Sequence, residues 1–443
     1  MTAAPASPPG PNPPGTSGIS PRNEPAGPDI AAVQRHTVKV LMAAQVVAGV
    51  GMGSMISSGG LLLEHLTGSA ATAGLANTLT TLGAALLSVP LAALSRSRGR
   101  RAGLGTGWLI AAAGALTVLA AAALRLPPLL LAGMLLIGSG TATNLQSRYA
   151  AADLAAPGGR ARALSLVVWS TTVGSVLGPN LSGPGAVLAR ALELPGTAGT
   201  FVFSVAAFAL GWAVVHTRLR PDPLLLAARH DAAATGTGRA APSSFATRTR
   251  GALRRVTASP SALTGLVALV LGHAVMVSVM TMTPVHLAHH GASLSVVGLT
   301  VSLHIAGMYG LSPLVGRAAD RLGRIPVILL GQALYAAATL LAGMAGGRQW
   351  MVATGLFLLG LGWSCATVAG STLLSESTDA AHRSAVQGVS DMLMNLVGAA
   401  GGALSGGLLA LAGYGGLNAA AAVLLVPVSA LALYLSLRTR WRR

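Results

Sequence analysis

The sequence predicts an all-α membrane protein with about twelve transmembrane helices in two pseudo-symmetric halves of six. Three observations support this: an apolar composition, hydrophobic runs long enough to span a bilayer, and an internal repeat. Hydrophobic residues make up 52% of the 443 residues and charged residues only 9%, and the mean hydropathy is +0.66. An ordinary soluble domain has about 25% charged residues. Most of this chain is therefore expected to lie in lipid.

The apolar runs give the positions of the spans, because a helix needs about 20 apolar residues to cross the hydrocarbon core. We expect spans at residues 38–58, 70–94, 103–124, 128–149, 163–189, 199–216, 260–284, 295–316, 325–345, 351–374, 385–412 and 416–437. The first six form an N-terminal half, residues 38–216, and the last six form a C-terminal half, residues 259–437.

The remaining segments are polar or basic. Residues 1–37 are rich in proline and glycine and predict a disordered cytoplasmic tail. Residues 217–258 contain eight arginines and predict a basic cytoplasmic linker between the halves, and residues 438–443 predict a basic C-terminal tail.

The net charge of +18 could indicate nucleic-acid binding, but its distribution follows membrane topology. With the N-terminus inside, 26 of the 29 Lys and Arg residues lie in or at the edge of cytoplasmic segments, and only Arg125, Arg190 and Arg348 lie outside. This is the positive-inside pattern. We therefore expect a multi-pass protein of a bacterial inner (plasma) membrane with both termini cytoplasmic and no nucleic-acid partner.

The internal repeat relates the two halves through polar and glycine residues that recur 222 to 224 positions apart. The matched pairs are Gly138 and Gly360, Asp153 and Glu376, Arg160 and Arg383, and Gly99 and Gly323. A duplicated six-helix unit explains this constant offset. The fourth and tenth spans are then equivalent.

The loop after the span at 295–316 carries five signature residues: Gly316, Asp320, Arg321, Gly323 and Arg324. The pattern resembles the loop signature of the major facilitator superfamily, which implies a role in gating. It supplies a tight turn, an acid that can sit at a helix N-terminus of the opposite half, and arginines for the cytoplasmic edge. An ordinary basic loop with a chance Asp-Arg pair is the alternative. The equivalent loop at 92–101 keeps its glycine and arginines but lacks the acid.

The span at 163–189 contains Gly174, Gly178, Pro179 and Gly183. This spacing resembles the antiporter signature of drug and proton exporters in the same superfamily, with Ser182 where one glycine would stand. Glycines allow neighbouring helices to approach closely, and proline bends a helix. Plain helix packing is the alternative interpretation.

Two residues are candidates for proton coupling. Asp391 is a carboxylate inside a predicted span, where a charge is costly and usually faces a cavity or a partner. A salt bridge with Arg383 or Arg148 is the alternative role. His304 is flanked by apolar residues and can titrate near neutral pH.

Polar, aromatic and soft side chains in the spans suggest a substrate cavity. The candidates are Arg148, Trp169, Asn180, Met280, Trp363 and Asn395. Each of these residues alone is more often a packing residue than a ligand, and Arg148 can be an arginine that extends to the membrane edge. His286, His289 and His290 favour a solvated loop over a metal site. We expect no metal and no cofactor, and the single cysteine, Cys365, excludes a disulfide within the chain.

The resemblance covers residues 38–437 and implies alternating access to a central site between two halves. Because the sequence has no Walker A pattern, a proton gradient is the expected energy source. Proton-coupled export of a small amphipathic or drug-like molecule is the leading hypothesis, and uptake of a metabolite by proton symport or facilitated diffusion is the alternative. A convincing cluster of catalytic groups is missing from the spans, so an enzyme is not expected. The expected partners are a small-molecule substrate, protons and lipid, with the chain as a monomer.

The topology prediction can be tested by labelling introduced cysteines after replacing Cys365. We expect cysteines near both termini and in the 217–258 linker to react with a membrane-impermeant reagent only in inverted vesicles. Labelling of the linker in intact cells would overturn the assignment.

Overall fold

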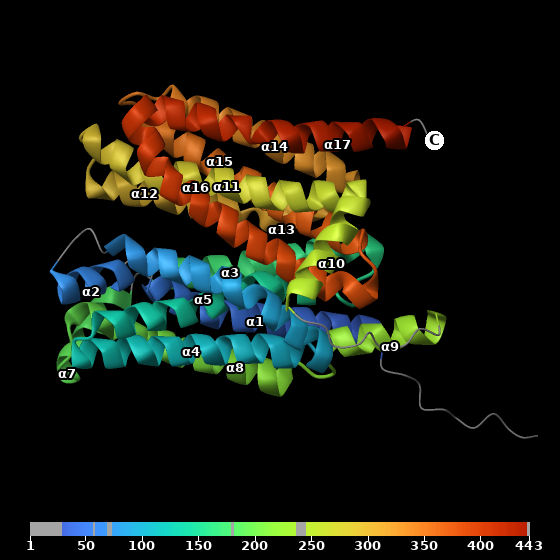
Figure 1. The fold of residues 1–443 in the computed structure, drawn as a ribbon, viewed down its shortest axis with the longest axis horizontal. Coiled ribbons are helices and arrows are strands. Elements are labelled where there is room, and N and C mark those ends of the chain that lie inside the picture. The colour runs from blue at the N-terminus through green and yellow to red at the C-terminus, as the bar shows by residue number, and fades with distance from the viewer. Residues whose placement is uncertain (1–28, 56–57, 69–72, 179–180, 236–244, 441–443) are drawn as a thin grey trace, which may run out of the picture.

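The computed structural model describes residues 29–55, 58–68, 73–178, 181–235 and 245–440. These residues form helices and no strands. Figure 1 shows two layers of helices, α1 to α8 in blue to green and α11 to α17 in yellow to red. Helices α9 (Pro223–Thr235) and α10 (Phe245–Ala258) lie toward one end of the bundle, which we call the linker side. The predicted all-α membrane fold is confirmed.

The first layer has its own apolar core. Its helices are α1 (Ile30–Met55), α2 (Ser58–Thr67), α3 (Ala73–Arg98), α4 (Arg100–Leu124), α5 (Pro127–Ala150), α6 (Arg160–Leu177), α7 (Ser182–Ala191) and α8 (Gly199–Arg218). At the centre of the core, Trp108 stacks on Phe208 with their ring centroids 5.8 Å apart. Both side chains are fully buried, so α4 and α8 are held face to face.

The second layer repeats this arrangement with longer helices. Its helices are α11 (Pro260–His289), α12 (Leu294–Ile305), the π-helical segment η5 (Ala306–Gly310), α13 (Ser312–Leu322), α14 (Arg324–Gly343), α15 (Gln349–Glu376), α16 (Ala380–Val423) and α17 (Leu425–Arg440). In its core the hydroxyl of Tyr335 donates to the carbonyl of Gly272 at 2.8 Å. This bond joins α14 to α11.

Ten helical stretches in the described residues are long and apolar enough to span a membrane. Twelve spans were predicted, and two differences account for the lower number. Residues 380–438 form one stretch where two spans were predicted. The predicted span at 163–189 is divided between α6 and α7, so it is not among the ten stretches. The predicted break near residue 412 coincides with Gly413, whose φ of 67° is not helical. Glycine adopts this conformation without a steric penalty.

The predicted N-terminal tail ends earlier than expected. Helix α1 begins at Ile30, and the backbone N–H of Ala31 donates to Asp29 Oδ1 at 2.9 Å. The Gln34 side chain also donates to the carbonyl of Ala151. Residues 30–37 therefore extend the first helix, while residues 1–28 lie outside the described residues.

The linker contacts both layers. Asp222 accepts hydrogen bonds from the backbone N–H of Arg101, at 2.8 Å, and of Leu224, at 3.1 Å. Further along, Ala252 and Val256 of α10 are buried in an apolar cluster that includes residues of α3, α11, α15 and α16. The basic linker is thus attached to the bundle through a carboxylate at one end and apolar side chains at the other.

Candidate functional site

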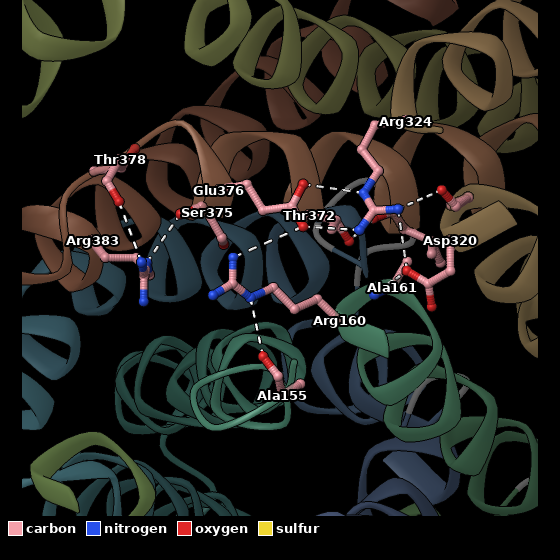
Figure 2. Close-up of polar contacts among 12 residues, drawn as sticks. Ala155, Arg160, Ala161, Asp320, Arg324, Thr372, Ser375, Glu376, Thr378 and Arg383 are labelled. Carbon is pink, nitrogen blue, oxygen red and sulfur yellow. Dashed lines mark hydrogen bonds and ion pairs between the residues drawn. The ribbon is translucent and has the colours of Figure 1, made fainter. Parts of the chain in front are cut away.

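The second-half loop forms a charged cluster at the linker side. Gly323 turns the chain with φ of 94°, and Arg324 then pairs with Glu376 through Nε and Nη2 at 3.1 and 2.8 Å. Its Nη1 lies 3.2 Å from Asp320 Oδ1 and also donates to the carbonyl of Ala319. Figure 2 shows this guanidinium between the two carboxylates.

Asp320 connects this cluster to the opposite half. Its carboxylate accepts hydrogen bonds from the backbone N–H groups of Ala161, at 3.2 Å, and Arg162, at 2.9 Å. These N–H groups belong to the first turn of α6, where the helix dipole favours a negative charge. The side chain of Arg160 lies 3.9 Å from Glu376 across the same boundary. The α13–α14 loop is therefore attached to the N-terminus of α6.

The remaining signature residues have different surroundings. Gly316 lies so close to Ser165 and Ala161 of α6 that a side chain would overlap them. Arg321 is exposed. Gly316 and Asp320 thus contact the opposite half, the first because it is small and the second through its charge. Arg324 belongs to the charged cluster.

The first-half loop forms a second cluster that the sequence reasoning missed. Arg100 is fully buried and pairs with Asp153 through Nε and Nη2 at 2.8 and 3.1 Å. The same Nη2 donates to Gln387 Oε1 of α16 at 2.8 Å. Because Asp153 and Glu376 are partners in the internal repeat, Arg100 is the structural equivalent of Arg324. The repeat offset was the signal that could have identified it.

The third contact between the halves is an ion pair in the interior. Arg148 Nη2 of α5 donates to Asp391 Oδ1 of α16 at 2.7 Å, and these side chains are 2% and 0% exposed. Beside it, the Tyr149 hydroxyl lies 3.0 Å from the Ser390 hydroxyl. Arg383 is bonded instead to the carbonyls of Ser375 and Thr378. Of the two salt-bridge partners considered for Asp391, the structure shows Arg148.

A small cavity with room for about one water molecule lies next to this ion pair. It is lined by Gln45, Asn144, Leu145, Arg148, Val167, Val168, Thr171, Tyr309 and Trp363. These residues come from α1, α5, α6, η5 and α15, so both halves contribute. The cavity therefore has the position expected of a central transport site.

The aromatic wall of the cavity is held in place by its neighbours. The Trp363 indole Nε1–H donates to His273 Nδ1 at 3.1 Å, and the Trp363 and Tyr309 rings meet edge to face with centroids 5.5 Å apart. Such contacts fix the orientation of a large side chain. His273 is a polar residue of the predicted span at 260–284, and only the fold reveals its proximity to Trp363.

Several predicted site residues do not line this cavity. Trp169 is 38% exposed, because Val167, Val168 and Thr171 occupy the cavity face of α6. Met280 packs against the core of the second half, and Asn395 donates to the carbonyl of Asp391 in its own helix. Asn180 and Pro179 lie outside the described residues.

The histidine predictions also have different outcomes. His304 is completely buried in the second half, with Nδ1 2.8 Å from the carbonyl of Leu356. His286 stacks on Tyr414 and contacts the carbonyl of Gly346. The described residues contain no group of three or more His, Cys, Asp or Glu side chains that could hold a metal ion.

The antiporter-like glycines lie at a close helix contact. A Cβ on Gly178 would lie 2.5 Å from the backbone of Gly53, and one on Gly174 would overlap the backbone of Gly49. This glycine-to-glycine contact brings α6 against α1. Gly183, in contrast, is exposed and has open space around it.

Two six-helix groups around a central cavity, with paired loop clusters at one end, define a multi-pass membrane transporter. The family model of the Major Facilitator Superfamily matches residues 41–293 and 279–442, and this chain belongs to that family. Members of the family are transporters, not enzymes.

Comparison with known proteins supports this assignment. The chain is 39% identical over 399 residues to the uncharacterized MFS-type transporter YddS of Bacillus subtilis (strain 168), covering 89% of this chain and 90% of that one. It is 29% identical over 413 residues to the riboflavin transporter RfnT of Brucella anthropi, covering 91% and 95%. The crystal structure of the human organic anion transporter MFSD10 has the same fold, with a TM-score of 0.69, 18% identity and coverage of 90% and 99%.

The Asp320 contact predicts a transport defect in Asp320→Asn. The amide keeps the shape but removes the charge at the N-terminus of α6, which is worth about 1 kcal/mol. We expect membrane insertion to be unchanged and transport in proteoliposomes to fall about fivefold, because exchange between the two access states is disturbed. Asp379→Asn is the control, since Asp379 is exposed and its side chain does not cap α16. Normal transport by Asp320→Asn would show that this loop does not gate.

The α1–α6 contact predicts a different defect in Gly178→Val. A branched side chain would meet the backbone of Gly53 and force the helices apart, at a cost of about 1–3 kcal/mol. We expect a lower thermal unfolding temperature in detergent and a broad loss of transport. Gly183→Val is the matched control and should be neutral. Equal stability of the two variants would contradict the packing role of Gly178.

Proposed function

We propose that this protein is a proton-coupled secondary transporter of a small organic molecule, and that it works by alternating access to the cavity between its halves. The Arg148–Asp391 pair is its coupling element. Two observations support this proposal: Arg148 lines the cavity, and its carboxylate partner belongs to the other half. The solute and the proton then act on the same pair of side chains.

The loop clusters serve as gates in this proposal. Asp320 and Arg100 each bond a group of the opposite half at the linker side. Opening the cavity toward that side requires these bonds to break. Gly316, Gly323 and Arg324 support the contact by allowing the turn and positioning Asp320, while exposed Arg321 contributes positive charge at the edge.

We assign the linker side to the cytoplasm of a bacterial cell. The arginine distribution supports this orientation, and the relatives from Bacillus subtilis are consistent with a plasma-membrane location. Each half contributes to a cavity contained within one chain, so the proposal requires only a monomer.

Export of an amphipathic or drug-like molecule by proton antiport is the direction that the glycine signature favours. Gly174 and Gly178 make the helix contact that such a signature requires. The apolar part of the cavity, with Val167 and Val168, suits an amphipathic solute.

Uptake by proton symport is the second candidate, and the charge of the cavity favours it. The charged residue that lines the cavity is the cation Arg148, whereas Asp391 lies behind it. A proton antiporter for cations would be expected to present the carboxylate. The relationship to a riboflavin transporter also shows that a relative moves a metabolite.

Asp391→Asn tests the coupling element. The amide retains the shape and can still accept a hydrogen bond from Arg148, but it cannot release a proton. We expect downhill exchange to persist and gradient-driven accumulation to disappear. The measurement is flux in proteoliposomes under imposed proton gradients of either sign. Accumulation with the proton flow indicates symport, and accumulation against it indicates antiport.

The double variant Arg148→Gln with Asp391→Asn is the folding control, because it leaves no unpaired buried charge. It should insert normally and lack coupling. If Asp391→Asn keeps full gradient-driven accumulation, the coupling proposal is wrong and His304 becomes the next candidate.

A further inference from the structure

The cavity contains buried polar atoms that have no partner in the protein. Arg148 Nε and Nη1 lack hydrogen-bond partners, and so does Gln45 Oε1. Both side chains line the cavity and are at most 2% exposed. Buried polar atoms are normally paired, and each unpaired one costs about 1–3 kcal/mol. These three atoms indicate what a bound group must supply. Because the cavity has room for about one water molecule, a larger ligand requires the two halves to separate.

The unpaired atoms define complementary ligand groups. Nε and Nη1 lie on different edges of the guanidinium, whereas Nε and Nη2 share an edge. Once Asp391 releases Nη2, a carboxylate fits the Nε–Nη2 edge with its two oxygens. Gln45 Oε1 is an acceptor, so it requires a donor on the ligand. A single molecule with a carboxylate and a separate N–H or O–H would satisfy both sites.

The aromatic part of the cavity lining favours a flat ring. Trp363 and Tyr309 meet edge to face, and the bond from Trp363 to His273 fixes the indole. Val167 and Val168 add apolar contacts. Aromatic side chains held in this way pack well against a planar conjugated ligand.

We propose that the substrate is a small aromatic monoanion with a hydrogen-bond donor, and that it binds Arg148 in place of Asp391 while Asp391 takes up one proton. This substrate proposal rests on the proposed function. It specifies the class of substrate and whether the substrate and the proton move in the same direction. The proton comes from solvent and ends on the Asp391 carboxyl. The ion pair is replaced by a second pair, between Arg148 and the ligand.

The proton uptake follows from the surroundings of Asp391. It is fully buried, its Oδ2 has no partner, and Arg148 is the cation bonded to it. The other charged or titratable groups nearby are Arg100 of α4, Tyr149 of α5, His273 of α11 and Tyr309 of η5. Arg100 is already paired with Asp153. A buried carboxylate that loses its cation is strongly disfavoured and becomes neutral by protonation.

The sign of coupling then follows from the charge of the substrate. An anion and a proton that bind together move in the same direction, which is symport. A cation would compete with the proton for Asp391, which is antiport. An anionic substrate therefore selects uptake along an inward proton gradient over export.

Equilibrium binding to the purified full-length protein tests this class with matched probes. The probes are para-aminobenzoate, its neutral amide, its cationic amidine, the pair benzoate and cyclohexanecarboxylate, and riboflavin. We expect para-aminobenzoate to bind about tenfold or more tightly than its amide, because a bond to a charged group is lost in the amide. The amidine should bind least, and benzoate should bind more tightly than its saturated analogue.

Calorimetry in buffers of different ionisation enthalpy measures the proton. We expect uptake of about one proton per bound para-aminobenzoate at neutral pH. Asp391→Asn should bind the anion more tightly without proton uptake, since the amide carries no charge that competes with the anion for Arg148. Arg148→Gln combined with Asp391→Asn should fold and lose the preference for the anion.

Equal binding of the amide, preference for the amidine, binding of riboflavin alone, or no binding of any aromatic anion would overturn the substrate class. Anion binding without proton uptake would overturn the exchange of partners on Arg148. These measurements do not depend on flux, so they separate a wrong substrate class from a wrong coupling element.

Discussion

The structure depends on pairing a few buried cations with a small number of carboxylates. The sequence has 11 Asp and Glu residues among 443. Five of them, Asp153, Asp222, Asp320, Glu376 and Asp391, anchor the linker or the contact between the halves. A charge buried without a partner costs several kcal/mol. Asp320 and Asp391 bond groups of the opposite half, so their positions restrict how the two halves can meet.

The two halves carry equivalent loop clusters that share a framework but differ in chemistry. Arg100 with Asp153 and Arg324 with Glu376 are equivalent pairs. In the second half Asp320 adds a charge that bonds backbone N–H groups of α6. The first half has Arg96 at the equivalent position, and Arg100 instead reaches the neutral side chain of Gln387. The two loops share their geometry, while an arginine in place of the acid at residue 96 changes how the contact between the halves is made.

The sequence was sufficient for the fold because lipid restricts the backbone to helices of known length. Hydropathy located the spans, and the break at Gly413 was predicted within a residue. The site was harder to predict, because the cavity combines residues from five elements and periodicity does not reveal which helices face each other. Arg148 and Trp363 were candidates that line it, whereas Trp169 faces elsewhere on α6. Gln45, Tyr309 and His273 could be connected to Trp363 or Arg148 only through the packing.

The way each ion pair is distributed between the halves explains why the interior pair is suited to coupling. Arg100 and Arg324 each have a carboxylate partner in their own half, so separation of the halves leaves both cations paired. Arg148 and Asp391 belong to different halves, and both are buried. Separating them leaves two uncompensated charges, which is far more costly than breaking a hydrogen bond to an amide or a backbone N–H. Opening toward the linker side therefore requires that one charge be neutralised and that the other receive a new partner. In the mechanism that we propose, a proton and an anionic ligand together do both.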